Sequence, residues 1–416
     1  MFAPLDPSHL WRKKGTTVTK VDFEDLAGNT ATFLDEYRDK KPLLRVGAIA
    51  APHELLTLGE IDDLLTSEAI RPPYFRMAKG GDQIRDGVFT QLTRVQLSHM
   101  DDVVDPVKVI QAFQGGATIT WNSMNHFNAN LRQIATTLSR TLGCRSDVVS
   151  FLTPGGRVQG FAPHLDSTEV FVIQLYGQKK WSVWETIIPR PSAGYALDPQ
   201  TLGEPTMEFV MNPGDVLYLP WGTPHVASSV DQMSFHLSVT TKPRSLSELL
   251  QDIVKDVTEG DESFSEQPTL NESRAHDVTE VLSRAVQRLV LKLDSLDLST
   301  MSKRAIVTAS NQIGTGHINF FEAMAESEAS LGELTSLVRA EGQAALVIED
   351  ARDGKVDVKV GLRTFRMDDR AIPALQILQR DPVITVAELS AHAGDSAAVA
   401  LVQTLLRVGY LKSVRP

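Results

Sequence analysis

Residues 146–242 consist of short β-rich runs separated by turns that contain glycine, proline and aspartate. The runs that stand out lie at residues 148–152, 169–175, 180–184, 206–210, 215–219 and 234–240. Many short strands with turn signals about every 8 to 12 residues are typical of all-β sandwiches and barrels. This stretch therefore predicts a two-layered or closed β core.

The segments on either side of this β core are predicted to contain helices. Residues 53–66 and 127–142 carry apolar side chains at helical spacing, and the second helix is expected to end near Gly143. After residue 245 the pattern is helical again, with one apolar face formed by Val281, Ala285, Leu289 and Leu293. A chain of 416 residues is too long for a single core, so we expect several domains.

The last part of the chain, from about residue 342, has a mixed pattern. Two strand-like runs flank Arg352-Asp353-Gly354, which is a hairpin signal. Helical pieces and a strand-like end follow, at residues 371–379, 386–393, 395–407 and 410–414. Helices followed by a short β element are typical of a winged helix.

Three side chains in the β core could bind a metal. His164 and Asp166 are separated by one residue. Strand side chains alternate between the two faces, so both can project to the same side of a strand or of its entry loop. His225 stands 61 residues after His164, behind a Pro-Gly-Asp turn. Two imidazoles and one carboxylate on one face of a metal are typical of non-haem Fe(II) oxygenases. A lone His-x-Asp also occurs by chance, and a buried histidine is often only hydrogen-bonded.

The sequence around these residues resembles the JmjC family of Fe(II)- and 2-oxoglutarate-dependent oxygenases, within the cupin superfamily. It looks most similar to the ribosomal-oxygenase branch. The blocks that carry this resemblance are QGFAPHLD at residues 159–166, EVFVIQL at 169–175 and PGDVLYLPWGTPH at 213–225. Upstream, FLDEY at residues 33–37 and KKPLL at 40–44 resemble the opening of that branch.

The resemblance implies an α+β chain with a double-stranded β-helix core, the jelly roll of the cupins and JmjC proteins. It also implies a C-terminal helical dimerisation segment and a winged-helix domain. On this basis residues 1–243 form the catalytic domain with an N-terminal helical-strand extension, 244–340 the dimerisation segment and 341–416 the winged helix. A homodimer would form through faces that contain Leu289 and Leu293, although periodicity alone fits an intramolecular packing face equally well.

The resemblance further implies that His164, Asp166 and His225 are the metal ligands and catalytic residues, with Fe(II), 2-oxoglutarate and O2 as cofactor and co-substrates. Lys179, 15 residues after His164, stands where the family places the cation for the distal carboxylate of 2-oxoglutarate. Ser238 could donate a hydrogen bond to the same molecule. The alternative for Lys179 is a solvated lysine in a Gly-Gln-Lys-Lys turn.

The chain departs from the branch at two positions near the co-substrate. Val149 and Phe151 stand where the branch usually has an asparagine and a tyrosine, both of which can contact 2-oxoglutarate in relatives. The residues expected to bind the metal, and Lys179, are retained. We therefore expect a pocket that is more apolar around the co-substrate than in those relatives.

The function implied is hydroxylation of an amino-acid side chain in a protein, such as a ribosomal protein, or in a peptide. Polar residues expected at the mouth of the barrel could contact that substrate, namely Arg76, Asn122, Asn125 and Trp221. Two alternatives stay open. One is an oxygenase of a natural-product precursor peptide or a small molecule, and the other is a cupin-like binding or regulatory protein whose winged helix reads DNA.

Charge and composition restrict the possible partners. The net charge is −11, and the C-terminal arginines alternate with aspartates, so no basic stripe for DNA phosphates is expected. No apolar run reaches the roughly 18 residues that span a bilayer. Cys144 is the single cysteine, and the first residues lack a secretory-signal pattern, so a cytoplasmic protein is expected.

Overall fold

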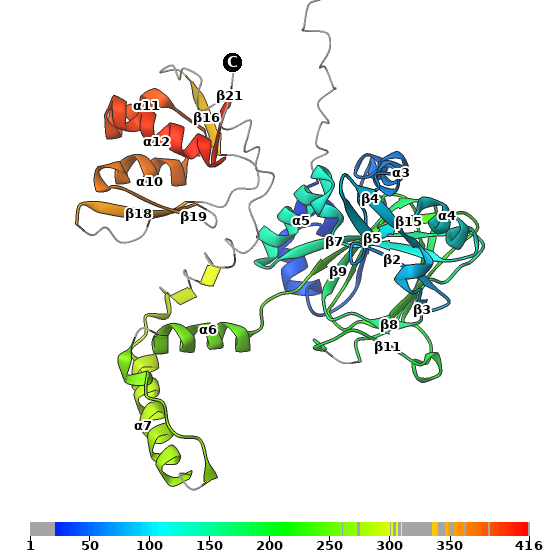
Figure 1. The fold of residues 1–416 in the computed structure, drawn as a ribbon, viewed down its shortest axis with the longest axis horizontal. Coiled ribbons are helices and arrows are strands. Elements are labelled where there is room, and N and C mark those ends of the chain that lie inside the picture. The colour runs from blue at the N-terminus through cyan, green and yellow to red at the C-terminus, as the bar shows by residue number, and fades with distance from the viewer. Residues whose placement is uncertain are drawn as a thin grey trace, which may run out of the picture. The chain divides into compact units, whose positions relative to one another are not determined.

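The protein divides into two compact units near Lys242, with Leu142–Arg145 grouped with the second unit (Figure 1). The computed structural model describes residues 21–187, 189–259, 261–272, 275–299, 301–302, 305–306, 309, 335–339, 346–348, 353–360, 363–381 and 383–414. Residues 310–334 of the predicted dimerisation segment, and position 352 of the predicted hairpin turn at 352–354, lie outside these residues. None of the described helices is long and apolar enough to cross a membrane.

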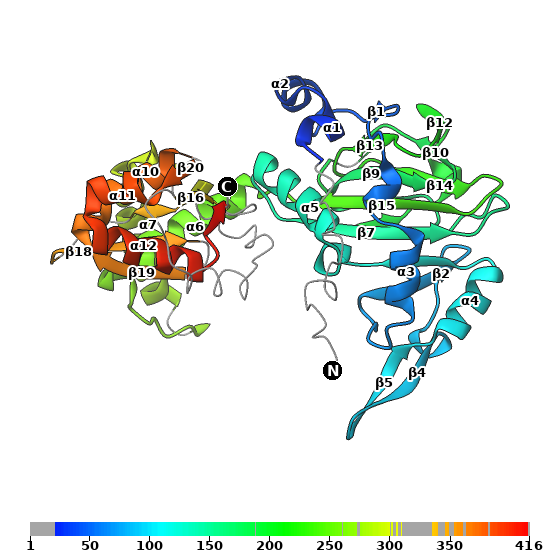
Figure 2. The same ribbon diagram turned by 90° about the horizontal axis from the view of Figure 1, so that it is seen from above.

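Two antiparallel sheets form the core of the first unit. The larger sheet has, in spatial order, β1 (Leu43–Arg45), β13 (Val216–Leu219), β9 (Glu169–Tyr176), β15 (Ser234–Thr241), β7 (Ser146–Thr153), β6 (Thr118–Trp121), β2 (Phe75–Lys79) and β3 (Asp82–Gln83) (Figure 2). The smaller sheet has β11 (Tyr195–Ala196), β8 (His164–Leu165), β14 (His225–Ser229), β10 (Lys179–Val183) and β12 (Met207–Met211). The predicted jelly-roll core is confirmed.

The two sheets pack through an apolar cluster supplied by both of them. Its buried members are Val170, Val172, Trp181, Val183, Met211, Leu217 and Leu219. Removing one such side chain from water contributes about 1.5–3 kcal/mol. This cluster therefore holds the sheets together and also closes off one side of the space between them.

The outer face of the larger sheet is covered by the N-terminal helices. They are α1 (Phe23–Ala27), α2 (Thr30–Thr32) and a π-helical turn (Phe33–Tyr37). The Phe33 ring lies 4.8 Å from the ring of Tyr218 and 5.6 Å from that of Phe171. Strand β9 is thus buried on both faces, which explains why its sequence is apolar throughout instead of alternating.

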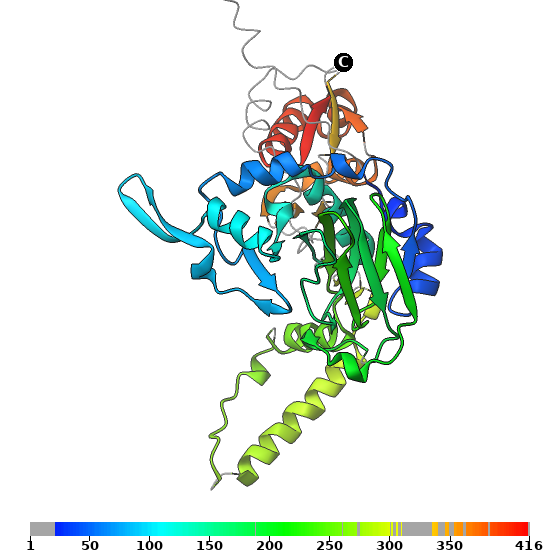
Figure 3. The ribbon, with the colours of Figure 1, turned by 90° about the vertical axis from the view of Figure 1, so that its right-hand side faces the viewer.

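Three further helices and one hairpin complete the first unit. The helices are α3 (Leu58–Leu65), α4 (Pro106–Gln114) and α5 (Ala129–Leu142). Strands β4 (Thr90–Val95) and β5 (Ser98–Val104) project as a two-stranded ribbon (Figure 3). The sequence did not predict this hairpin, because its turn places Gln96 rather than a glycine at positive φ (53°).

The second unit contains a pair of helices and a C-terminal α/β domain. The helices are α6 (Leu246–Glu259) and α7 (Ala275–Asp294), and an ion pair of 2.7 Å links Lys292 of α7 to Asp261 in the loop after α6. The domain comprises β16 (Ser336–Arg339), β17 (Val347–Ile348), β18 (Lys355–Val360), β19 (Arg363–Asp368), α10 (Ile372–Arg380), β20 (Val383–Thr385), α11 (Val386–Ala393), α12 (Asp395–Arg407) and β21 (Leu411–Val414). The three predicted helices are confirmed, whereas strand β19 was not predicted.

Gly177 makes the tight turn between β9 and β10, two residues before Lys179. Its φ is +62°, and a Cβ atom there would lie 2.0 Å from the carbonyl oxygen of Met233. Only glycine satisfies both conditions. This turn sets where β10 begins.

We expect Gly177→Ala to destabilise the first unit by more than about 2 kcal/mol, because the methyl group must displace backbone. Gly203→Ala is the matched control: its φ is +65°, but nothing lies within 4 Å of its Cβ, so only a conformational cost of about 1 kcal/mol applies. All five tryptophans precede residue 243, so tryptophan fluorescence during urea unfolding reports on this unit. Equal losses in both variants would contradict the steric argument.

Candidate functional site

A pocket of about 600 Å³ lies between the two sheets. Strands β7, β9 and β15 supply one wall, and β8, β10 and β14 supply the other. Ligand pockets in proteins commonly have such a volume and a largely apolar lining. The predicted metal ligands, Lys179 and Ser238 all line this pocket.

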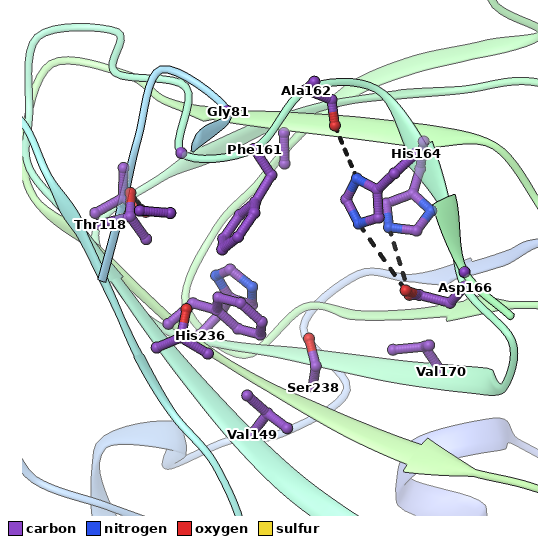
Figure 4. A pocket seen from close by; sticks show the side chains of 18 of the residues that line it. Gly81, Thr118, Val149, Phe161, Ala162, His164, Asp166, Val170, His236 and Ser238 are labelled. Carbon is purple, nitrogen blue, oxygen red and sulfur yellow. Dashed lines mark hydrogen bonds and ion pairs between the residues drawn. The ribbon is translucent and has the colours of Figure 1, made fainter. Parts of the chain in front are cut away.

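The structure brings His164, Asp166 and His225 together at one end of the pocket (Figure 4). Strands β8 and β14 pair with His164 directly opposite His225, and the two imidazole rings lie 4.4 Å apart. Asp166 follows β8, with its carboxylate 4.0 Å from Nε2 of His164 and 3.7 Å from Nε2 of His225. One ligand atom from each residue lies within 4.8 Å of the others, so all three could hold one ion.

Backbone carbonyls orient both imidazoles. Nδ1 of His164 donates to the carbonyl of Ala162 at 2.9 Å, and Nδ1 of His225 donates to that of Thr223 at 3.0 Å. A carbonyl can only accept, so Nδ1 carries the proton and Nε2 keeps its lone pair for a metal. Burial and the neighbouring His164 lower the pKa of His225, which favours the neutral form that a metal requires. Two nitrogens and one carboxylate fit Fe(II), with the open coordination positions that an oxygenase needs.

Lys179 is a buried cation at the other end of the pocket. It is the first residue of β10, its exposure is 3%, and its Nζ donates to Oγ1 of Thr153 at 2.7 Å. Burial lowers its pKa to about 7. Among the described residues that line the pocket, Asp166 is the only one with a carboxylate. A buried ammonium group with donors to spare fits an anionic ligand group.

The solvated lysine of the Gly-Gln-Lys-Lys turn is Lys180, not Lys179. Lys180 is exposed, and its Nζ lies 3.4 Å from Glu208. The two neighbours point to opposite sides because strand side chains alternate. The alternative reading of Lys179 as a solvated turn residue was therefore wrong.

Ser238 and the two departures from the family pattern lie on neighbouring strands. Ser238 of β15 pairs with Val149 of β7, and both line the pocket. Phe151 lines it as well and stacks on the His236 ring at 4.9 Å and 10°. Val149 and Phe151 make part of this wall apolar, while Ser238, Thr240, His236 and Thr153 supply its polar groups.

The four predicted substrate contacts fall into two groups. Arg76 and Asn122 line the pocket, although the Asn122 amide donates to the carbonyl of Pro73 at 2.6 Å. Asn125 and Trp221 are not among the lining residues. Their polar atoms bind backbone instead, to the amide of Val148 at 3.0 Å and to the carbonyl of Pro191 at 2.9 Å. A polar residue in a loop near a site often fixes that loop through hydrogen bonds to backbone. The sequence does not distinguish this structural role from contact with a substrate.

Several residues of the site were not assigned to it from the sequence. They are Thr118, Thr120, Thr153, Phe161, Trp181 and His236. Strand alternation was the available signal for two of them. His236 lies two residues before Ser238, and Trp181 lies two residues after Lys179, so each shares its neighbour's face. The threonines gave no signal, because threonine is common in any strand.

Comparison with known proteins identifies the domain that carries this pocket. Residues 122–249 match the model of the JmjC domain. The chain is 26% identical over 268 residues to the bifunctional lysine-specific demethylase and histidyl-hydroxylase NO66 of Dictyostelium discoideum, covering 57% of this chain and 50% of that protein. It is 31% identical over 193 residues to ribosomal oxygenase 2 of Rattus norvegicus, covering 44% of this chain and 41% of the relative. The chain thus spans half or less of the length of these relatives.

A solved structure shows that the likeness in fold extends further. YcfD, a ribosomal oxygenase from Escherichia coli in complex with cobalt and succinic acid, superposes with a TM-score of 0.55 at 18% identity. The match covers 94% of this chain and 99% of YcfD. Residues 122–249 therefore form a JmjC domain, and the chain is a homologue of the ribosomal oxygenases.

Proposed function

We propose that this protein is an Fe(II)- and 2-oxoglutarate-dependent oxygenase that hydroxylates an amino-acid side chain in a protein substrate. The observation that carries the proposal is the pairing of two sites in one pocket. An oriented cluster of two histidines and an aspartate lies at one end, and the buried cation of Lys179 lies at the other. A dicarboxylate that chelates a metal would find a partner for each of its ends in this pocket.

Each residue has a distinct task in this proposal. His164, Asp166 and His225 would hold Fe(II), which supplies the activation of O2 while 2-oxoglutarate is decarboxylated to succinate. Lys179 would bind the distal carboxylate, and Ser238 would donate a hydrogen bond to the same molecule. Val149, Phe151 and the inter-sheet cluster keep water away from the reacting groups.

The relatives support a ribosomal protein as the substrate. The rat and human relatives are named ribosomal oxygenases, and NO66 is named a histidyl-hydroxylase. The same Escherichia coli relative has also been solved with cobalt and 2-oxoglutarate. A ribosomal target would place the enzyme in the cytoplasm. Arg76 and Asn122, on the pocket lining, are the residues we assign to substrate contact.

We assign residues 341–416, together with β16, to a winged-helix domain without a DNA-binding role. Three of its arginines are paired with neighbouring aspartates: Arg366 with Asp357 at 3.1 Å, Arg370 with Asp368 at 2.7 Å and Arg380 with Asp381 at 2.9 Å. Charges neutralised in this way do not form a phosphate-binding stripe. Salt-sensitive retention of the protein on duplex DNA would contradict this assignment.

Helices α6 and α7 within residues 244–340 are assigned to a homodimer interface. Leu289 and Leu293, which the periodicity indicated, are half-buried within the unit. The exposed apolar side chains of α7 are instead Leu282, Val286, Val290 and Leu291. A second copy of the chain would cover them. We expect Val286→Glu to convert a dimer to a monomer in analytical ultracentrifugation, whereas Arg284→Glu on the same helix leaves the dimer intact.

Turnover tests the proposed activity. Fe(II)-loaded protein should convert 2-oxoglutarate to succinate in the presence of O2, and ribosomal proteins treated with it should gain about 16 Da, the mass of one oxygen atom. Asp166→Ala should abolish both turnover and Mn(II) binding, because it removes the only carboxylate ligand. His126→Ala, which changes an exposed histidine of the same unit, is the control. Wild-type Mn(II) affinity in Asp166→Ala, or no succinate from the wild type, would refute the proposal.

The low pKa of Lys179 predicts a pH dependence of co-substrate binding. In the ligand-free protein the ammonium loses its proton above about pH 7, yet the distal carboxylate needs it charged. The affinity of Mn(II)-loaded protein for 2-oxoglutarate should therefore fall as pH rises from about 7 to 9, by up to roughly tenfold per unit, with uptake of a proton. Calorimetry in buffers of different ionisation enthalpy measures both the affinity and the number of protons taken up. Lys179→Arg stays charged and should lose this dependence; a pH-independent wild type would contradict the assignment.

A further inference from the structure

His236 is a buried imidazole whose hydrogen-bonding capacity is unused. Its exposure is 4%, and Nδ1 has no hydrogen-bond partner among the described residues. A buried polar atom without a hydrogen-bond partner lowers the stability of a fold by on the order of 1–3 kcal/mol. His236 lines the pocket, so its ring borders any ligand bound there.

The strand register places His236 between the two ends of the pocket. On the larger sheet, Ser234 pairs with Thr153, which binds Lys179, and His236 pairs with Phe151 one layer further on. Ser238 lies in the layer after that. Figure 4 agrees, with His236 between Thr118 at one end and the histidine–aspartate cluster at the other.

The opposite sheet gives the same order of layers. Lys179, Trp181 and Val183 of β10 pair in turn with Ser229, Ala227 and His225 of β14. Trp181 thus lies in the layer between Lys179 and the metal cluster, and its ring meets that of His236 at 5.8 Å and 74°. A molecule that joins Lys179 to the metal cluster must pass along His236.

Packing fixes the orientation of the His236 ring. The imidazole is neutral and can donate one N–H hydrogen bond. Phe151 stacks on one face and Trp181 meets the ring at an angle, so the imidazole cannot swing away to find another partner. Burial and the nearby charge of Lys179 lower the pKa of His236 well below its ordinary value. A neutral imidazole keeps one N–H, and a carboxylate can accept from this group and from an ammonium at once.

We propose that His236 binds the distal carboxylate of 2-oxoglutarate together with Lys179. This inference rests on the proposed function and deepens it. His236 shares its layer with the rings of Phe151 and Trp181. The same layer holds Gln174, whose amide donates to Ser234 at 2.9 Å, and Thr120 of β6. The imidazole N–H can add a second contact there beside the Lys179 ammonium. His236 thereby makes the pocket selective for a dicarboxylate over a monocarboxylate of the same length.

The test compares two ligands that differ only in this carboxylate. The probes are 2-oxoglutarate and 2-oxopentanoate, which has the same five-carbon chain without the distal charge. Their affinities for full-length Mn(II)-loaded protein are measured by calorimetry, independently of turnover. His236→Phe removes both nitrogens but keeps a flat ring between Phe151 and Trp181.

For His236→Phe we expect 2-oxoglutarate binding to weaken at least roughly tenfold, as for loss of a hydrogen bond to a charged group, with 2-oxopentanoate binding unchanged within about twofold. His236→Asn, which keeps a donor, should recover part of the loss, and His236→Leu provides a second nitrogen-free variant if the phenylalanine does not fold. Lys179→Met is the positive control for a selective loss.

Two results would overturn the inference alone: equal weakening of both ligands, which indicates packing only, or no weakening while Lys179→Met shows its selective loss. If the wild type does not prefer 2-oxoglutarate over 2-oxopentanoate, the proposed function fails and this inference fails with it. A selective loss in His236→Phe supports both.

Discussion

The pairing of β8 with β14 is the contact on which the site depends. It places His164 directly opposite His225, although the two residues are 61 positions apart in the chain. Cross-strand neighbours have Cβ atoms about 4.5–5.5 Å apart, so the pairing alone brings both imidazoles within reach of one ion. The carbonyls of Ala162 and Thr223 then orient the rings, and Asp166 completes the cluster.

The other end of the pocket shows a conflict between stability and binding. Lys179 has a pKa of about 7, against 10.5 for the free side chain, because the buried charge is poorly solvated. Between these two values the unfolded chain binds more protons than the folded one, so this group's destabilisation is full below pH 7 and disappears toward pH 10.5. The unsatisfied nitrogen of His236 adds to this cost. A ligand that brings negative charge would offset both costs, so the ligand-free fold carries them at the place where binding is proposed.

Much of this arrangement could be predicted from the sequence, and the failures have physical causes. Turn signals and apolar runs located six strands of the core, and family resemblance indicated the candidate metal ligands and Lys179. The β4–β5 hairpin was missed because Gln96 occupies its turn. Asn125 and Trp221, which we expected at the mouth of the barrel, bind backbone through their polar atoms. In both cases a residue's neighbours decide what it does, and its type does not record them.

The sequence by itself determined the β core, the chemistry of its candidate ligands and the two apolar departures at Val149 and Phe151, since residue type and local spacing suffice for these. Only the tertiary structure decided that Lys179 is buried while Lys180 is solvated, and that His236 lies between the ends of the pocket. The reason is that strand register is a property of pairs of distant segments. A shift of one residue turns every side chain of a strand to the opposite face, and no local pattern records which partner each strand meets.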